Sequence, residues 1–231
     1  GNFMAARVNR QAHAGAFAPY IDEGLRYKPS IRVEGACASG GLALATAIKN
    51  VLSGMADVTL CLGVEVQNSV KAIYGADILA GAGWANQRKD GHAYFFPGKF
   101  SDRAGACYEK YGFDYVRKGT AQWFVNAIEN ARLCETAQEY HNKVEDLNAL
   151  GLMKPNPRSF VDHLNVFDCS KVSDGASAIA VVSEEGLKRT GIDKSEAVEV
   201  TGYAQVVDDL TKDPDDLTDE EISAFVRLDI D

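Results

Sequence analysis

One cysteine, Cys37, stands where a thiol could do covalent chemistry. It sits in a turn of small residues, GACASGG over positions 35–41, between an expected strand and an expected helix. Backbone amides and the dipole at a helix start favour the thiolate, which is the nucleophilic form of cysteine. The turn also offers N–H groups to an oxyanion, and its small side chains let a substrate approach. These features predict a nucleophile for acyl transfer between thioesters.

The other four cysteines lack this setting. Cysteine is often simply buried, and on residue type alone packing is the default for all five. Cys61 falls mid-strand and is predicted to be core, while Cys107 and Cys134 fall on expected helices and are assigned structural roles. Cys169 lacks a helix start of the right kind. The cysteine number is odd and no CxxC pair occurs, so we expect no disulfide framework, no metal site and a reducing compartment, the cytoplasm.

The elements around Cys37 are predicted as strand, turn, helix, strand. A strand is expected over 31–34, and the helix after Cys37 has apolar residues at three- and four-residue steps, with Gly54 as its stop. Residues 58–64 are apolar on both faces, which is typical of a buried, central parallel strand. Together they predict a βαβ unit. Further strands are expected over 1–6, 176–183 and 197–206, and further helices over 16–27 and 184–189.

Residues 74–157 differ in character, with many glycines and aromatic residues. We expect a loop-rich insertion that carries helices near 102–111, 120–133 and 135–150. Such an insertion is either a lid or binding loop, or a decorative subdomain. Its aromatic residues either line an acyl pocket or form the insertion's own small core; they are Trp84, Phe95, Phe96 and Phe100.

Composition limits the partners. The chain has 231 residues, 46% hydrophobic and 25% charged, with a net charge of -9, which argues against nucleic acid and against a basic membrane-binding patch. Its apolar runs are too short to span a membrane. The acidic stretch 208–221 is expected to be a solvated linker into a helix, with Thr218 and Glu221 as its capping box.

Three segments resemble the thiolase superfamily. GACASGGLALATAIKNVLSGMADVTLCLGVE is similar to its nucleophile segment, and CSKVSDGASAIAVVSEEG resembles its Asp-Gly-Ala-rich strand. PGKFSDRAGACYEKYGF and NAIENARLCETAQEYHN resemble the loop domain of sterol-carrier-protein-2 (SCP2) type thiolases. The resemblance implies an α/β fold with α/β/α/β/α layering. It also implies a thiolase N-terminal domain over 1–73 and 160–231, and an inserted loop domain over 74–159.

The resemblance also implies chemistry. Cys37 would accept the acyl group, with its own N–H in an oxyanion hole, and Ser170 would lie near the pantetheine arm of coenzyme A. Arg or Lys residues of the loop domain would bind the phosphates of coenzyme A. Acyl-CoA would be the substrate, with no metal, in a homodimer or tetramer of lipid metabolism, with a further partner subunit as another option.

Several motifs of the family's second half are not found, and its first strand is missing. These motifs are a Gly-His-Pro segment whose histidine activates the nucleophile, a Cys-x-Gly segment whose cysteine shuttles a proton, and a Glu-Ala-Phe-like segment. His92, His141 and His163 lie in the wrong context to replace them. We therefore expect a piece of a longer enzyme, an incomplete chain or one part of a two-chain assembly.

Three other functions remain open at this point. A thiolase-superfamily aldolase or a hydroxymethylglutaryl-CoA-synthase-like enzyme would differ mostly in residues outside this chain. A non-catalytic, thiolase-like subunit would have no need of a cysteine at position 37. An unrelated hydrolase fits least well.

Overall fold

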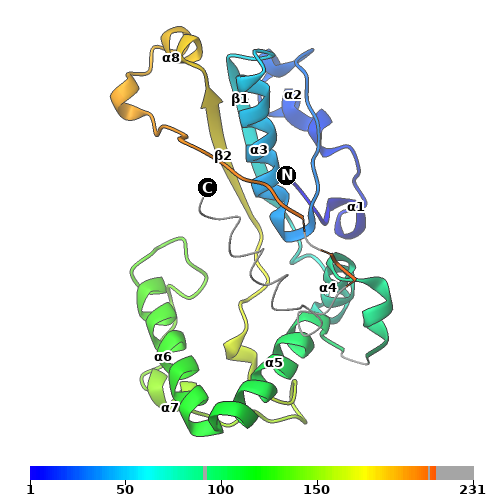
Figure 1. Ribbon diagram of the computed structural model, residues 1–231, viewed down its shortest axis with the longest axis vertical. Helices are drawn as coiled ribbons and strands as arrows, with labels where there is room; N and C mark the ends of the chain where they lie inside the picture. The colour runs from blue at the N-terminus through cyan, green and yellow to red at the C-terminus, as the bar shows by residue number, and fades with distance from the viewer. Residues whose placement is uncertain (91–92, 208, 212–231) are drawn as a thin grey trace.

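The computed structural model describes residues 1–90, 93–207 and 209–211. Figure 1 shows two regions: α3, β1, β2 and α8 lie in one, α5, α6 and α7 lie in the other, and α4 lies near their junction. The helices are α1 (Ala5–Val8), α2 (Ala18–Ile21), α3 (Ser39–Leu52), α4 (Ala72–Leu79), α5 (Phe95–Tyr111), α6 (Phe113–Ala131), α7 (Leu147–Gly151) and α8 (Glu184–Thr190). The strands are β1 (Val58–Glu65) and β2 (Gly175–Val182). The α/β class predicted from the sequence is confirmed.

The two strands form an antiparallel pair, in a register that joins Val58 to Val182 and Glu65 to Gly175. Gly1 runs beside the other edge of β1, since its N donates to Leu62 O at 2.6 Å and its O accepts from Val64 N at 3.2 Å. The prediction of a βαβ unit with a central parallel strand is therefore wrong. β1 takes its strand partner from far along the chain, after the expected insertion, and not from residues 31–34.

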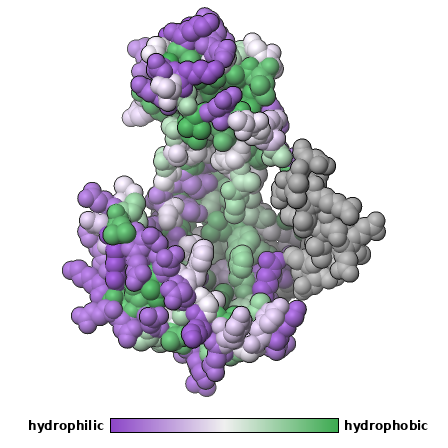
Figure 2. All heavy atoms as spheres, turned by 60° about the vertical axis from the view of Figure 1, so that its left-hand side comes forward, coloured by the Kyte–Doolittle hydropathy of each residue, from purple (hydrophilic) through white to green (hydrophobic). Residues whose placement is uncertain are grey.

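Part of the sheet surface is apolar and exposed. Val58, Leu60 and Ile179 are between 44% and 49% exposed. Figure 2 shows hydrophobic residues at the surface between the two regions, and hydrophilic residues over the helices of the lower one. An apolar sequence shows that a strand could be buried, but not that it is. In the described residues β2 is mostly exposed. The prediction for 176–183 is therefore correct in that a strand forms, and wrong in that the strand is not part of the core.

Helix α3 carries the turn of Cys37 and packs on β1. Its alanines and its leucines at helical spacing favour the helix, and Ala45, Ala47 and Ile48 are buried. Gly54, with a φ of 71°, lies just past its end in the left-handed region that suits glycine. The helix and its stop agree with the sequence prediction.

The second region is built from long helices. Helix α5 begins earlier than predicted, because Pro97 is tolerated in a first helical turn, where its missing N–H would have no partner. Helix α6 also begins earlier than predicted, directly after Gly112. Gly112, with a φ of 84°, separates the two helices. Phe124, Val125 and Ile128 of α6 pack with Leu147 of α7 into a small core.

Several expected elements are absent from the described residues. Residues 1–6 end in α1 instead of forming a strand, and 31–34 and 197–206 form no strand. The expected helix 16–27 is broken into short pieces around Asp22, whose side chain accepts from Gly24 N. Only Leu147–Gly151 of the expected helix 135–150 forms. Around Asp22 a local turn bond replaces the regular helix, whereas Phe3 and Met4 are held by bonds to the distant Glu65. The capping box of Thr218 and Glu221 lies outside the described residues.

Within the part of the chain that the structure describes, no helix has both the length and the apolar character that crossing a membrane requires.

The prediction for 184–189 is confirmed by α8, with Gly191 as its left-handed stop at a φ of 71°.

Candidate active site

Cys37 lies in a short 3-10 turn, η3 (Ala36–Ala38), that leads directly into α3. Its side chain is exposed. Ala36 has a φ of 49°, which is rare for a residue with a side chain and marks a constrained turn. The carboxylate of Glu34 accepts from Ala36 N, which ties the residue before Cys37 to the chain that precedes the turn.

The buried hydroxyl of Ser39 holds this turn from inside. Its Oγ accepts from Gly35 N at 3.0 Å and donates to Ala36 O at 2.7 Å, and Ser39 is 5% exposed. One side chain therefore fixes the residues on the N-terminal side of Cys37. The amides of a first helical turn have no carbonyl within the helix to bond, so this turn can present N–H groups to a ligand.

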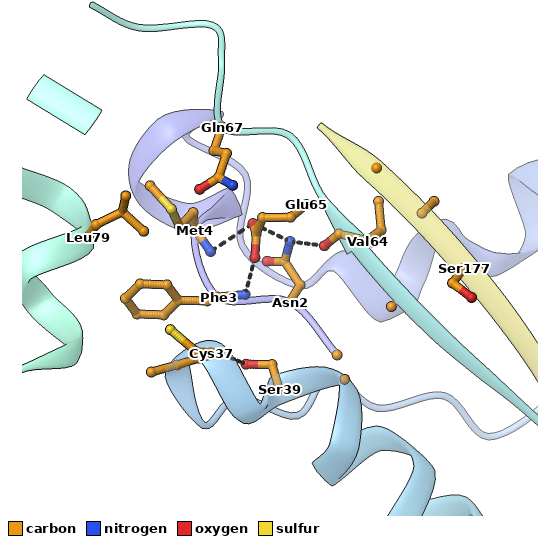
Figure 3. A pocket seen from close by; sticks show the side chains of 16 residues that line it. Asn2, Phe3, Met4, Cys37, Ser39, Val64, Glu65, Gln67, Leu79 and Ser177 are labelled. Carbon is orange, nitrogen blue, oxygen red and sulfur yellow. Dashed lines mark hydrogen bonds between the residues drawn. The ribbon is translucent and has the colours of Figure 1, made fainter. Parts of the chain in front are cut away.

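The turn opens into a pocket with a volume of about 510 Å³ (Figure 3). Phe3, Met4 and Leu79 supply apolar side chains around Cys37. In Figure 3, Val64 of β1 and Ser177 of β2 lie on the other side from Phe3 and Leu79. Three glycines in the lining, Gly40, Gly63 and Gly175, contribute backbone alone. A Cβ built at any of these three glycines meets no atom within 4 Å, so the space beside them is open.

Glu65 anchors the apolar side of the pocket. Its carboxylate accepts from Phe3 N at 2.8 Å, from Met4 N at 2.9 Å and from Asn2 Nδ2 at 2.9 Å. Figure 3 shows these bonds converging on Glu65 at the end of β1. The carboxylate thus satisfies two backbone amides of a non-strand segment that must lie beside Cys37.

Asp174, from the Asp-Gly-Ala motif, joins the end of β1 to the start of β2. Its Oδ1 accepts from Gln67 N and from Asn68 N, each at 2.8 Å. Gln67 in turn donates from Nε2 to Ser173 O at 3.0 Å. The motif therefore has a physical role at the pocket, since Gln67 and Gly175 both line it.

Ser170, the predicted coenzyme A residue, is exposed in the segment that leads to β2, and it is not among the residues that line this pocket. The next residue, Lys171, pairs with Glu139. The hydrogen bond from Lys171, followed by one from Asn142, holds the pKa of Glu139 below its usual value. The segment that carries Ser170 is thereby tied to the irregular stretch after α6.

The remaining cysteines differ from Cys37 in place. Cys61 is buried in β1, as predicted; with Leu62 and Gly63 it does spell Cys-x-Gly, but mid-strand. Cys107 and Cys134 are exposed, so packing does not explain them, and Cys134 lies beyond the end of α6. A hydrogen bond with the Thr136 hydroxyl lowers the pKa of Cys134. Burial raises the pKa of Cys169.

The four aromatic residues for which an acyl pocket and a small core of the insertion were both open do not line this pocket. Phe95 is buried and packs edge-on against Phe96, while Phe100 is 57% exposed. Sequence reasoning missed Phe3 and Leu79 instead. Phe3 follows Asn2, and Asn2 together with Glu65 forms a partly buried polar contact that only the fold reveals.

Within the described residues, no group of three His, Cys, Asp or Glu side chains is arranged to hold a metal ion. The features that could receive a ligand are the thiol, the backbone amides of its turn and the apolar wall.

Residues 4–185 match the family model described as thiolase, N-terminal domain. The chain is 32% identical over 212 residues to an acetyl-CoA acetyltransferase of Methanocaldococcus jannaschii, covering 90% of this chain and 50% of that protein. It is 27% identical over 195 residues to benzoylsuccinyl-CoA thiolase subunit BbsB of Thauera aromatica, covering 84% and 47%. It is 28% identical over 213 residues to sterol carrier protein 2 of Rattus norvegicus, covering 87% and 36%.

The chain spans about half the length of the curated relatives it matches. The family match covers most of the residues that carry the Cys37 turn, the loop helices and the Asp-Gly-Ala motif. The resemblance predicted from those segments is thus confirmed, and the chain belongs to the thiolase family.

Proposed function

We propose that the protein is a coenzyme A-dependent acyltransferase of the thiolase type, in which Cys37 carries the acyl group. The observation that carries the proposal is the exposed thiol of Cys37 at the start of α3, facing a pocket with one apolar and one open wall. Relatives named acetyl-CoA acetyltransferase and thiolase support the class of reaction.

The first step is transfer of an acyl group to Cys37. The sulfur attacks the thioester carbonyl, a new S–C bond forms, and the S–C bond to coenzyme A breaks. The proton from Cys37 ends on the thiol of coenzyme A. The N–H groups at the η3 turn are suited to stabilise the oxyanion of the tetrahedral intermediate, and that of Cys37 itself is the one we assign.

The second step returns the acyl group. In the degradative direction the acyl-enzyme forms from a 3-ketoacyl-CoA: the Cys37 sulfur attacks the 3-keto carbon, the C2–C3 bond breaks, and acetyl-CoA leaves with the proton on its C2. The thiol of coenzyme A then attacks the acyl-enzyme, the Cys37 S–C bond breaks, and the proton returns to Cys37. In the synthetic direction the deprotonated C2 of acetyl-CoA attacks the acyl-enzyme, a C–C bond forms, and the Cys37 S–C bond breaks. The two half-reactions share one site, which gives ping-pong kinetics.

We place coenzyme A along the exposed segment around Ser170, with that hydroxyl near the pantetheine arm. The loop domain, residues 74–159, would supply the cations for the phosphates, while 1–73 and 160–231 form the catalytic α/β domain. A homodimer or tetramer, a further partner subunit and a cytoplasmic location remain predictions. The relative named as a thiolase subunit lends support to a partner chain.

Labelling with radioactive acetyl-CoA tests the acyl-enzyme on the complete protein. We expect label on the wild type and on Cys107→Ala, a matched loss of an exposed cysteine outside the pocket, and none on Cys37→Ala. Equal labelling of Cys37→Ala and wild type would reject the proposal.

A non-catalytic subunit is the second candidate, because one relative is named as a subunit. Iodoacetamide at neutral pH separates the two. A catalytic Cys37 should react faster than free cysteine, whereas in a scaffold it should react no faster. A synthase-like enzyme would still acylate Cys37, and its products would identify it. An aldolase-like enzyme breaks a C–C bond without acyl transfer, so it would leave Cys37 without label.

A further inference from the structure

We propose that Phe3 determines which acyl groups Cys37 accepts, by limiting the length of the chain that fits beside the sulfur. The inference rests on the proposed acyl-enzyme. It adds a specificity-determining residue from the segment before α1, which carries none of the motifs that mark the family.

The pocket around the Cys37 thiol differs from one side to the other. In Figure 3 the Cys37 side chain points toward the Phe3 ring, and Leu79 approaches from α4 on the same side. The ends of β1 and β2, marked by Val64 and Ser177, lie on the other side of the view, and Gly63 and Gly175 of these strands are backbone with open space beside it.

This asymmetry assigns the two parts of a thioester substrate. The pantetheine arm is a narrow chain with amide groups, and it suits a wall of backbone where close approach is possible. Gly175 also lies in the same segment as Ser170, the proposed contact of that arm. The acyl group must extend from the same carbonyl in another direction, and the apolar surface there is that of Phe3 and Leu79.

Phe3 cannot easily withdraw. Its N–H donates to Glu65 Oε2 at 2.8 Å, and its carbonyl accepts from Arg32 Nη2 at 3.0 Å. The neighbours are fixed as well, because Met4 N and Asn2 Nδ2 both donate to Glu65, and Met4 is 1% exposed. The ring is therefore carried by backbone held on both sides, and a longer acyl chain would have to displace it.

Removal of the Phe3 ring should widen the pocket beside Cys37 without changing Cys37 itself. An additional methylene in an apolar pocket changes discrimination by roughly tenfold or more. For Phe3→Ala we expect the acylation rate with hexanoyl-CoA, relative to that with acetyl-CoA, to rise at least about tenfold, and for Phe3→Leu to rise less.

The experiment follows acylation of Cys37 in the complete protein by mass spectrometry, with acyl-CoA esters from acetyl to octanoyl. Phe17→Ala is the matched control, since Phe17 is 49% exposed and lies outside the pocket. It should keep the wild-type preference. Phe3→Leu keeps an apolar side chain should Phe3→Ala fail to fold.

The outcomes separate the two proposals. Acylation of Cys37 with an unchanged chain-length preference in both Phe3 variants would overturn the role of Phe3 and leave the acyl-enzyme standing. No acylation of wild-type Cys37 by any ester would overturn the proposed function itself, and the role of Phe3 with it. Glu65→Gln should weaken the preference without abolishing acetylation, because it loosens the backbone that carries the ring.

Discussion

The Oγ atom of Ser39 lies 3.0 Å from the backbone N of Gly35, across the turn that presents Cys37. The same hydroxyl donates to Ala36 O at 2.7 Å. The first residue of α3 therefore also organises the chain that precedes the nucleophile, and the position of the thiol depends on a side chain that is only 5% exposed.

Ser39→Ala should destabilise the fold and slow acylation. The substitution leaves Gly35 N without its partner, whereas Ala36 O keeps the bond from Ser39 N, and the loss costs about 1–3 kcal/mol. Urea unfolding and the acetylation rate of Cys37 measure the two effects. Ser53→Ala removes a hydroxyl at the exposed, opposite end of α3 and should change neither by much. An acetylation rate equal to that of wild type would argue against the turn as the positioning device.

Asp174→Ala should impair the site more than the fold. The lost bonds from Gln67 N and Asn68 N are exposed, so we expect a stability loss of about 1 kcal/mol. The end of β1 and the start of β2, which both line the pocket, would then separate. A misplacement of about 1 Å lowers reaction rates by about ten- to a hundredfold. Asp174→Asn keeps an acceptor oxygen and should retain most of the rate. This account would be contradicted if both variants lost rate only in proportion to the fraction of protein that is unfolded.

The ion pair of Arg117 and Asp168 should be the most costly to break. Arg117 Nη1 lies 2.8 Å from Asp168 Oδ2, and the side chains are 1% and 7% exposed. Arg117→Met leaves a buried carboxylate, with an expected loss of about 3–5 kcal/mol in the free energy of unfolding. The exposed pair of Arg189 and Asp57 is the control, and Arg189→Met should cost less than about 1 kcal/mol. Equal losses in the two variants would contradict this account.

The ion pair of Glu139 and Lys171 predicts that the stability of the fold depends slightly on pH. Because the folded pKa of Glu139 is lowered, chiefly by the Lys171 hydrogen bond, the stability it contributes is present above the unfolded pKa. It is lost as the pH falls through the folded pKa. Lys171→Met should raise the pKa of Glu139 in an NMR titration, whereas Lys188→Met, at a distant exposed pair, should not. If the pKa of Glu139 were unchanged in Lys171→Met, the ion pair would not connect the segment of Ser170 to the stretch after α6.

The local parts of this site could be predicted from the sequence, and the non-local parts could not. The turn of Cys37, helix α3 and its Gly54 stop depend on neighbouring residues, and all three are correct. The pairing of β1 with β2, by contrast, joins segments separated by the whole insertion. No periodicity in either segment specifies that partner.

The pocket shows the same division. Cys37 was identifiable because its chemistry is local, but Phe3 is held beside it by bonds to Arg32 and to Glu65, and Glu65 is 62 residues away in the chain. Conversely, the sequence left two interpretations open for the aromatic residues of the insertion, an acyl pocket or a small core, and Phe95 and Phe96 pack on each other. Apolar residues in a glycine-rich stretch do not reveal whether they contact a ligand or one another.

The measurement that tests the central claim most directly is peptide mapping of the complete protein after reaction with acetyl-CoA, before and after addition of free coenzyme A. We predict an acetyl group on the peptide that contains Cys37, and its removal by coenzyme A with formation of acetyl-CoA. An acetyl group on another residue, or one on Cys37 that coenzyme A does not remove, would contradict the account.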